Sequence, residues 1–290
     1  MKIHPLIRLL RPALVPTAIA DVVTGAAYAS GDAPLLRTMA ACVAGSCFYM
    51  GGMVLNDLAD RDKDAYLDPD RPLVRNPGIA SQAWGMVLAL FMIGLAAAML
   101  AGVPLIGAAV AACAVLYDLG AKKSFPADAV TLGAARGANL AMGIGVAGGA
   151  WNTGAWTLII GYALYIAAVT GASRAEDFKD AGARRKWLGI SLLPLLVGCG
   201  AMASLAEPGG GMTLFLLPAI ALIAALLHAL KDASRESTKR FVLRCLLCIF
   251  LLHIALLWST GHLVATGIVV ALAAASFYLL RVMKPVPIAD

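Results

Sequence analysis

Charged residues are scarce in this chain. Only 14% of its 290 residues are Asp, Glu, Lys or Arg, whereas 61% are hydrophobic. Soluble domains contain about 25% charged and about 45–50% apolar residues. The composition therefore argues against a soluble globular enzyme. It also excludes a disordered chain, which would have low hydrophobicity and high net charge.

Cysteines with polar surroundings or metal-ligand spacing are also lacking. All six lie inside apolar runs: Cys42, Cys47, Cys113, Cys199, Cys245 and Cys248. A disulfide framework is typical of short, Cys-dense secreted chains and is excluded here. The pair Cys245 and Cys248 matches a C-x-x-C pattern, but its apolar context favours a packing role over metal binding or redox chemistry.

Long apolar stretches dominate what is present. A membrane-spanning helix needs about 20 mostly apolar residues, and turn residues such as Gly, Pro, Ser and Asn separate the stretches. Ten transmembrane helices are predicted: 12–30, 34–55, 80–101, 103–119, 127–149, 154–173, 187–205, 212–230, 238–258 and 262–282. The predicted fold class is an all-α polytopic membrane protein. Residues 238–282 hold either two spans or one span and an interfacial helix.

The basic residues support this topology. If the N-terminus is cytoplasmic, the cytoplasmic loops and helix ends contain 21 of the 23 Lys and Arg residues. This asymmetry follows the positive-inside rule. It predicts ten spans with both termini in the cytoplasm, in an inner cell membrane. The net charge of +6 then faces anionic lipid headgroups and does not indicate a nucleic-acid partner.

An acidic loop follows the second predicted helix. It reads Asn56-Asp57-Leu58-Ala59-Asp60-Arg61-Asp62-Lys63-Asp64 and continues to Asp68-Pro69-Asp70-Arg71-Pro72-Leu73. The i, i+3, i+7 spacing of Asp57, Asp60 and Asp64 places them on one helical face. Three such carboxylates repel each other unless a cation lies between them, and oxygen ligands with room for water and phosphate suit Mg²⁺. Asn56 adds a neutral oxygen ligand or a hydrogen bond.

A second acidic loop follows the sixth predicted helix. Asp177 and Asp180 are again spaced i, i+3, and this loop opens on the same side of the membrane as the first. The two acidic clusters are therefore predicted to face each other over one cavity mouth, with a Mg²⁺-bound diphosphate between them. The alternative is that these acids are ordinary solvated surface residues.

Two predicted spans carry polar residues that are candidates for function. Asp21 is in the middle of the first, and Arg136 and Asn139 are one turn apart in the fifth. Ionisable groups within a span are costly and normally face a cavity or a partner. Arg136 is predicted to reach the diphosphate or to pair with Asp21. The alternatives are a structural ion pair and an arginine that extends to the interface. The isolated His228, His253 and His262 are assigned no function.

The acidic motif carries a family resemblance. Asn56-Asp57-x-x-Asp60-x-x-x-Asp64, followed by Asp70-Arg71-Pro72-Leu73, is similar to the signature of the UbiA superfamily of intramembrane prenyltransferases. The resemblance covers roughly residues 5–258, and the loop with Asp177 and Asp180 occupies the place of the second aspartate motif. Weaker similarities are Arg11-Pro12, Tyr117 with Lys122, and Leu132-Gly133.

This resemblance implies nine membrane helices around a central cavity. The chain is predicted to form a single domain over residues 1–290, in which 262–282 is an extra C-terminal helix and a second departure from the family pattern. It implies Mg²⁺-dependent transfer of a prenyl group from an isoprenyl diphosphate to an aromatic or other lipid-soluble acceptor. The implied metal and diphosphate ligands are Asn56, Asp57, Asp60 and Asp64, with Asp177 and Asp180 on a second metal. Arg71, Lys122 or Lys123 would hold phosphate oxygens, and Tyr117 would lie close to the substrate.

The second motif departs from the family pattern. Its third acidic position is Arg184 here, i+7 from Asp177. This cation either contacts the diphosphate in place of a second metal or joins Arg185 and Lys186 in a lipid-anchoring cluster. The departure keeps an alternative function open, a non-catalytic lipid or isoprenoid carrier that retains the cavity. A generic secondary transporter is disfavoured because no inverted repeat is evident.

Overall fold

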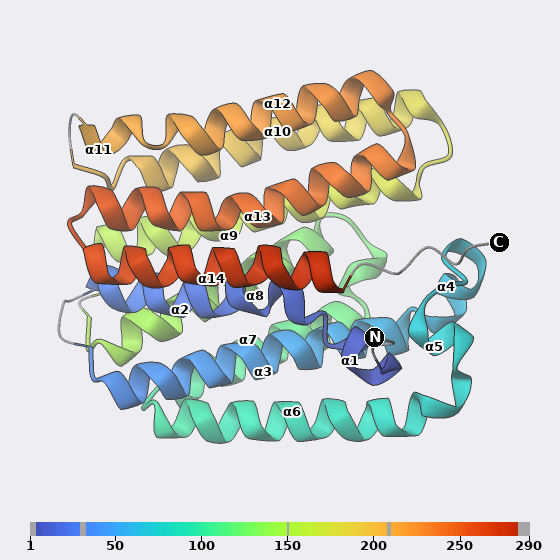
Figure 1. Ribbon diagram of the computed structural model, residues 1–290, viewed down its shortest axis with the longest axis horizontal. Coiled ribbons are helices and arrows are strands. Elements are labelled where there is room, and N and C mark those ends of the chain that lie inside the picture. The colour runs from blue at the N-terminus through green and yellow to red at the C-terminus, as the bar shows by residue number, and fades with distance from the viewer. Residues whose placement is uncertain (1–3, 30–32, 150, 208–209, 284–290) are drawn as a thin grey trace.

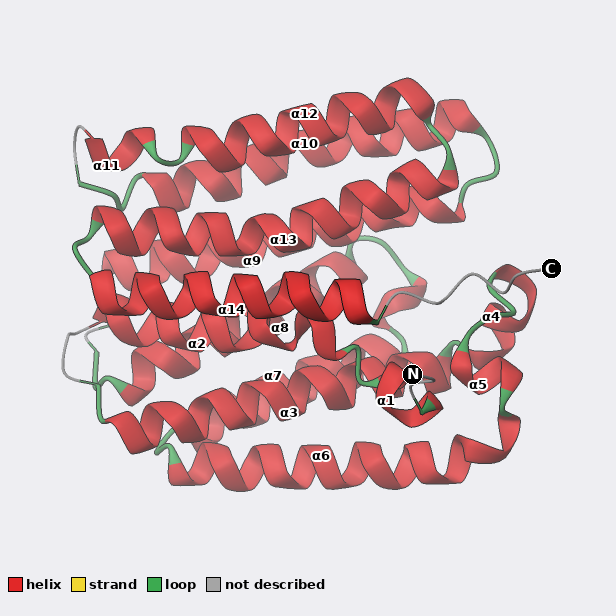
Figure 2. Cartoon of the chain, viewed as in Figure 1, coloured by secondary structure: helices red, strands yellow, loops and turns green. Residues whose placement is uncertain are grey.

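The computed structural model describes residues 4–29, 33–149, 151–207 and 210–283, and these residues form helices and loops without a β-strand (Figure 2). Ten long helices correspond in order to the ten predicted spans: α2 (Val15–Ala29), α3 (Leu35–Ala59), α6 (Ala80–Leu100), α7 (Pro104–Leu119), α8 (Ala127–Val146), α9 (Thr153–Ser173), α10 (Ala181–Ala203), α12 (Leu216–Asp232), α13 (Arg235–Ser259) and α14 (Leu263–Val282). The all-α fold class is confirmed.

Short helices connect the long ones. They are α1 (Pro5–Leu9), η1 (Pro12–Leu14), α4 (Arg61–Leu67), α5 (Pro72–Arg75), η2 (Pro77–Ile79), η3 (Ala121–Lys123), η4 (Arg174–Asp177) and α11 (Gly210–Thr213). The α1, α4 and α5 helices gather at one end of the bundle, where α14 also ends (Figure 1). The ten long helices from α2 to α14 each cross the bundle once. Because this number is even, α1 and the end of α14 lie at the same end of the bundle.

Seven helical segments are long and apolar enough to cross a membrane, and α7 is apolar but shorter. The count is roughly consistent with the nine to ten spans expected. The α2 helix has only 15 residues, and α8 carries Arg136 and Asn139 in its middle. Both of these helices lie inside the bundle rather than at its lipid-facing surface, because each packs against several neighbours.

The α2 and α8 helices approach each other unusually closely. A Cβ atom at Gly143 would lie 2.0 Å from the carbonyl oxygen of Val22, and one at Gly25 would lie 2.1 Å from that of Leu140. Only glycine permits this approach, as at many helix contacts in membrane proteins. The close contact brings the polar residues of the two helices together.

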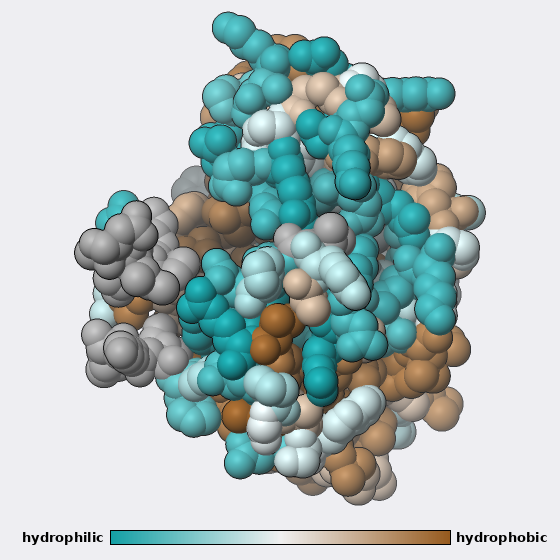
Figure 3. All heavy atoms as spheres, turned by 90° about the vertical axis from the view of Figure 1, so that its right-hand side faces the viewer, coloured by the Kyte–Doolittle hydropathy of each residue, from teal (hydrophilic) through white to brown (hydrophobic). Residues whose placement is uncertain are grey.

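A ring of helices surrounds the interior. The α8 helix packs against α2, α3, α7 and α9, and α13 closes the ring between α9 and α2. Outside this ring, α6 covers α3, α10 covers α9, and α14 lies over α2 and α13. Hydrophilic side chains gather on the end of the bundle that carries α4 and α5 (Figure 3). The bundle therefore has one strongly polar end.

Candidate active site

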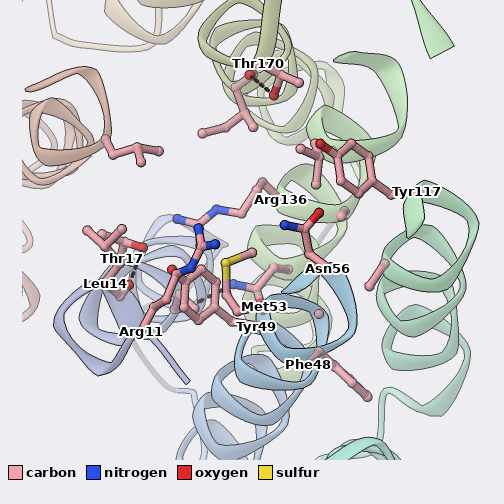
Figure 4. Close-up of a pocket in the computed structure, with 18 of the residues that line it drawn as sticks. Arg11, Leu14, Thr17, Phe48, Tyr49, Met53, Asn56, Tyr117, Arg136 and Thr170 are labelled. Carbon is pink, nitrogen blue, oxygen red and sulfur yellow. Dashed lines mark hydrogen bonds between the residues drawn. The ribbon is translucent and has the colours of Figure 1, made fainter. Parts of the chain in front are cut away.

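A cavity of about 290 Å³ opens within the ring of helices. Its wall includes a stripe along α3 formed by Gly45, Tyr49, Gly52 and Asn56, whose spacing of three to four residues keeps them on one face. Arg11 and Arg136 also line it, and both side chains reach toward Tyr49 (Figure 4). The cavity thus combines apolar walls with a few polar groups, as small-molecule sites do.

Asp57 is a buried carboxylate at the polar end of this cavity, with 4% of its surface exposed. Its Oδ1 accepts a hydrogen bond from Arg11 Nη2 at 2.8 Å and another from Arg71 Nη1 at 2.7 Å. Arg11 has a positive φ of 47°, which is uncommon for a residue with a side chain. Such backbone conformations persist where the surroundings impose them, often at functional sites. Two cations therefore converge on one buried carboxylate.

Lys122 joins three other side chains next to Asp57. Its Nζ lies 2.9 Å from Asp60 Oδ1, 3.1 Å from Asp118 Oδ1 and 3.4 Å from Asn56 Oδ1. With its amide turned over, Asn56 would instead donate to Asp60 and Asp118, at 3.2 and 3.1 Å. These residues come from α3, α7 and η3, so the cluster forms only when the three elements pack.

Asp64 completes the first motif from α4, just beyond the end of α3. Its Oδ2 lies 3.8 Å from Arg71 Nε, so Arg71 links Asp64 to Asp57. Burial raises the pKa of the Asp64 carboxyl; Arg71 opposes this rise, and the charges of Asp57 and Asp60 add to it. The structure therefore brings Asn56, Asp57, Asp60 and Asp64 together, as their spacing predicts. We call these four residues, with Asp118, Arg11, Arg71 and Lys122, the mouth cluster.

The acids of the second loop have different surroundings. Asp177 is exposed and forms an ion pair with Lys63 of the first loop, 3.2 Å away. Asp180 is exposed and caps α10, because its Oδ2 accepts a hydrogen bond from the backbone N–H of Ala183 at 2.6 Å. Backbone hydrogen bonds from Ala183 and Gly182 lower the pKa of the Asp180 carboxyl. The two loops meet, but neither acid contacts the mouth cluster, which reaches the cavity wall through Asn56, Asp118 and Arg11.

Arg184 does not contact the mouth cluster either. Its Nε donates to the backbone carbonyl of Ala233 at 2.6 Å, and its Nη1 donates to that of Phe178. Ala233 ends α12 in a left-handed conformation, so Arg184 ties this helix end to the second loop. Contact between Arg184 and a diphosphate stays a prediction without geometric support.

The two other residues predicted after the fourth span lie near the mouth. Tyr117 lines the cavity in α7, whereas Lys123 is exposed at the surface. Arg174 forms an ion pair with Asp128 and donates to the carbonyl of Lys122 at 2.8 Å. This bond links the second loop to the lysine that contacts Asp60.

A second polar group lies deeper, around the fully buried Asp21. Its Oδ1 accepts hydrogen bonds from Arg136 Nη2 at 3.1 Å and from the Tyr162 hydroxyl at 2.6 Å. Asn139 Nδ2 donates to Oδ2 at 2.9 Å, and His253 Nε2 lies 3.2 Å from Oδ1. Of the two partners predicted for Arg136, the structure shows Asp21.

The mouth cluster offers the donors that Mg²⁺ prefers, carboxylate and amide oxygens. Within the described ranges, no three His, Cys, Asp or Glu side chains lie close enough to hold a metal ion by themselves. Magnesium is usually bound through one or two carboxylates, with water and substrate phosphates supplying the other ligands. The donor set therefore fits a Mg²⁺ ion that binds together with a diphosphate.

Comparison with known proteins identifies the family. A model of the UbiA prenyltransferase family matches residues 13–242. The chain belongs to the UbiA prenyltransferase family. It is thus a multi-pass membrane protein of a prenyltransferase family, and α14 lies beyond the matched residues. No curated protein sequence matches the chain.

Solved structures share the UbiA fold. A UbiA homologue from Aeropyrum pernix K1 has 22% identity and a TM-score of 0.67, over 87% of this chain and 98% of that one. A structure of digeranylgeranylglyceryl phosphate synthase has 17% identity and a TM-score of 0.64, over 91% and 98%. A UbiA homologue from Archaeoglobus fulgidus bound to DMAPP and Mg²⁺ has 17% identity and a TM-score of 0.55, over 97% and 100%.

Four residues of these two polar groups were not predicted as site residues from the sequence. Arg11 is noted in the sequence only for its likeness to the family's Arg-Pro. The one sequence signal for Asp118 is its i+4 spacing to Lys122, with which it forms an ion pair. The sequence pattern does not single out Tyr162, and the isolated His253 is assigned no function. Their contacts with Asp21 span 141 and 232 positions of sequence, so no local pattern indicates them.

Proposed function

We propose that this chain transfers a prenyl group from an isoprenyl diphosphate to an aromatic or other lipid-soluble acceptor, in a Mg²⁺-dependent reaction. The observation that carries the proposal is the mouth cluster at the polar end of a cavity enclosed by membrane helices. Buried carboxylates and cations that share hydrogen bonds at one cavity mouth are typical of a site for a charged substrate. Membership of the UbiA family supports the same reaction class.

The diphosphate would bind to the cations of the mouth cluster. Arg11, Arg71 and Lys122 each carry donors that can turn to phosphate oxygens, and arginine matches two of them at once. Asn56, Asp57, Asp60 and Asp64 would hold Mg²⁺, released from their present ion pairs as the cations move to the phosphate. The homologue from Archaeoglobus fulgidus was solved with DMAPP and Mg²⁺, which supports this pairing of substrate and metal.

In the reaction, the bond between prenyl C1 and the diphosphate oxygen breaks, and its electron pair stays with the diphosphate. A carbon or heteroatom of the acceptor forms a bond to C1 and loses a proton. Asn56, Asp57, Asp60 and Asp64 would hold a Mg²⁺ ion that would stabilise the growing charge of the leaving group. Arg11, Arg71 and Lys122 would do the same through hydrogen bonds. The apolar walls would keep water away from the allylic cation.

The remaining predicted residues take supporting roles in this proposal. A second metal at Asp177 and Asp180 stays a prediction of the sequence, because one acid pairs with exposed Lys63 and the other caps α10; the ion pair between Asp177 and Lys63 holds the second loop next to the first. Tyr117 would contact the prenyl group from the cavity wall. The charge distribution of the sequence supports an inner membrane with this mouth on the cytoplasmic side.

A direct test is an assay of the purified protein with Mg²⁺, labelled prenyl diphosphates of several lengths and a panel of hydrophobic acceptors. The proposal expects a prenylated product that disappears when EDTA removes the metal. Binding of prenyl diphosphate without any product across the panel would favour the carrier function instead. The exposed positions of Asp177 and Asp180, whose partners are Lys63 and the start of α10, favour this second candidate, because they leave the mouth with one acidic motif.

A further inference from the structure

The central cavity is small for the reaction proposed above. Its volume of about 290 Å³ lies near the lower end of the range for sites that hold one small molecule, about 300–1,000 Å³. A prenyl transfer brings two lipid-soluble molecules together, and both reach the protein through the bilayer. The cavity as it stands has room for only one of them, so we expect one of its walls to open toward the lipid.

The wall of the cavity that faces α14 is built from the two ends of the chain. Leu14 of η1 and Thr17 of α2 line the cavity on one side of this wall, and Val242 and Leu246 of α13 line it on the other. We call the wall formed by these four residues the α14 seam. The α14 helix lies outside it, because it packs against η1, α2 and α13 (Figure 1). A molecule that enters from the bilayer between η1 and α13 must therefore pass α14.

The α14 helix is loosely packed. Its buried residues are Thr266, Val269 and Ser276, three of 20, which is a smaller share than in any other long helix of the described ranges. Close van der Waals packing is a main source of attraction between helices in a bilayer. Of the three helices outside the ring, α14 is therefore the one that separates at the lowest cost.

The two other helices outside the ring approach their neighbours much more closely. A Cβ atom at Gly198 of α10 would lie 2.7 Å from the carbonyl oxygen of Gly161 in α9, and one at Gly94 of α6 would lie 2.6 Å from the ring of Phe48 in α3. The one glycine between residues 263 and 282, Gly267, is exposed. The contact face of α14 therefore has none of the glycine contacts that hold α10 and α6 in place.

The two halves of α14 are held in different ways. In the half that follows the turn from α13, Val269 packs in a buried apolar cluster with Ala20 of α2 and Phe250 of α13. In the half near the mouth, Ser276 is the buried residue, and its hydroxyl donates a hydrogen bond to the backbone carbonyl of Ala13 in η1. Apolar packing thus anchors the first half, whereas a hydrogen bond from one side chain ties the second half to the wall of the cavity.

We propose that the mouth half of α14 is a gate, which swings away from η1 and opens the α14 seam to the bilayer. The hydrogen bond between the Ser276 hydroxyl and the Ala13 carbonyl is the latch of this gate, and the apolar cluster around Val269 is its hinge. The inference rests on the proposed prenyl transfer and adds the route by which a lipid-soluble substrate reaches the cavity. The α14 helix lies beyond the residues that the family model matches, so the gate is a feature of this chain.

The open state keeps the polar groups of α14 paired. A serine hydroxyl in a helix can turn to the backbone carbonyl four residues earlier, as the Thr266 hydroxyl does with the carbonyl of His262 at 3.0 Å. The backbone of α14 stays hydrogen-bonded within the helix, as the bilayer requires. Opening therefore costs the apolar contacts of one half-helix and the latch, and a minor open state of this kind is the usual basis of a gating motion.

The test locks the latch in the full chain. The double variant Ala13→Cys/Ser276→Cys joins η1 to α14 by a disulfide where the hydrogen bond already brings them together. The matched control, Ala20→Cys/Val269→Cys, pins the hinge half, where no movement is expected. Each protein is placed in nanodiscs with a phosphatidylcholine that carries a diazirine in its acyl chain. Mass spectrometry after illumination identifies the labelled residues and confirms the new disulfide.

Lipid should label the wall of the cavity only when the gate opens. In wild type we expect labelling of Val242 and Leu246, the residues of the seam on α13. Oxidation of the latch pair should reduce this labelling to the level found without illumination, and dithiothreitol should restore it. The hinge pair should be labelled as wild type is, before and after oxidation. The exposed Val264 should be labelled in every sample and serves as the internal standard.

A second pair of variants tests the gate without a disulfide. Ser276→Ala removes the latch and should raise the labelling of the seam about two- to tenfold, the effect of one lost hydrogen bond on the open fraction. Thr266→Ala removes a hydroxyl that bonds within its own helix end and should leave the labelling unchanged. Equal labelling of Ser276→Ala and wild type would overturn the inference, whether or not the latch disulfide forms.

Two further results would overturn the gate. One is a seam in wild type that lipid does not label, and the other is labelling that persists after the latch disulfide has formed. Binding of dimethylallyl diphosphate with Mg²⁺ is measured in the same nanodiscs, and it enters from the aqueous mouth. Its absence in wild type would contradict the proposed function, whereas its presence together with an unlabelled seam would contradict only the gate.

Discussion

The two acidic loops have similar sequences and different surroundings. In the first, Asp57 is 4% exposed and shares its oxygen with two arginines beside the cavity. In the second, Asp177 pairs with a surface lysine, and Asp180 caps the helix that follows. The same i, i+3 spacing thus accompanies a buried ion cluster in one loop and ordinary surface roles in the other.

The difference comes from what packs against each loop. The first loop continues α3, and it meets η1, α5 and η3, which bring Arg11, Arg71 and Lys122 to the carboxylates. The second loop is a short 3₁₀ helix between α9 and α10 that packs against α9, α10 and α13, with Asp177 and Asp180 exposed. Burial next to opposite charges is what marks a carboxylate as a candidate catalytic group; Asp57 has it, whereas Asp177 and Asp180 are exposed.

The largest expected effect is that of removing Asp57. Asp57→Ala should lower turnover with prenyl diphosphate about a thousandfold or more, because a metal ligand is lost and Arg11 and Arg71 lose their shared partner. Product formation with labelled substrate measures this, with unchanged elution on size exclusion as the folding control. Near-normal turnover would mean that the first loop is solvated surface, like the second.

Two adjacent lysines allow a matched comparison at the mouth. Lys122→Ala should raise the Kd for dimethylallyl diphosphate about ten- to a hundredfold, because charge-assisted hydrogen bonds contribute about 1.5–3 kcal/mol each. Lys123→Ala, an exposed position without a partner in the mouth cluster, should change the Kd less than about twofold. Equal effects of the two substitutions would show that general positive charge, and not the geometry around Lys122, holds the diphosphate.

A smaller effect is expected in the second loop. Asp177→Ala removes an exposed ion pair with Lys63, and such pairs contribute about 0–1 kcal/mol. Turnover should therefore fall less than about tenfold, with a modest change in the Mg²⁺ concentration for half-maximal rate. A loss as large as that of Asp57→Ala would show that the second loop moves into the cavity mouth when substrate binds.

The smallest effect on binding is expected for Arg184. Its donors are used by the carbonyls of Ala233 and Phe178, so Arg184→Ala should leave the affinity for dimethylallyl diphosphate unchanged. It should lower stability by about 1 kcal/mol per lost hydrogen bond, seen as a lower Tm in detergent. A clear loss of diphosphate affinity would instead place this cation at the substrate and revive the role suggested by its position in the motif.

The helices could be predicted from the sequence because a chain segment that crosses a bilayer is restricted to regular structure such as a helix. Backbone polar groups in a bilayer must be satisfied within a helix, so each long apolar stretch corresponds to one helix of the structure. The first acidic motif could be predicted equally well, since Asp57, Asp60 and Asp64 lie within about two turns of each other and each pairs with a cation, Arg71 at Asp57 and Asp64 and Lys122 at Asp60.

Contacts between distant helices were not predictable in the same way. Asp118 gains its role from Asn56 and Lys122, and the deep polar group depends on the close approach of α2 and α8 at Gly25 and Gly143. The spacing of Asp177 and Asp180 suited a metal site and a helix N-cap equally well. In the structure Asp180 is the N-cap of α10. Backbone geometry decides between the two roles, and residue spacing alone does not.

Binding of dimethylallyl diphosphate, titrated with and without Mg²⁺ in wild type, Asp57→Ala and Asp177→Ala, tests the central claim most directly. The account predicts Mg²⁺-dependent binding in wild type, little change for Asp177→Ala and loss of the Mg²⁺-dependent part for Asp57→Ala. Binding that is unaffected by Mg²⁺, or that survives in Asp57→Ala and disappears in Asp177→Ala, would contradict the assignment of the mouth cluster as the diphosphate site.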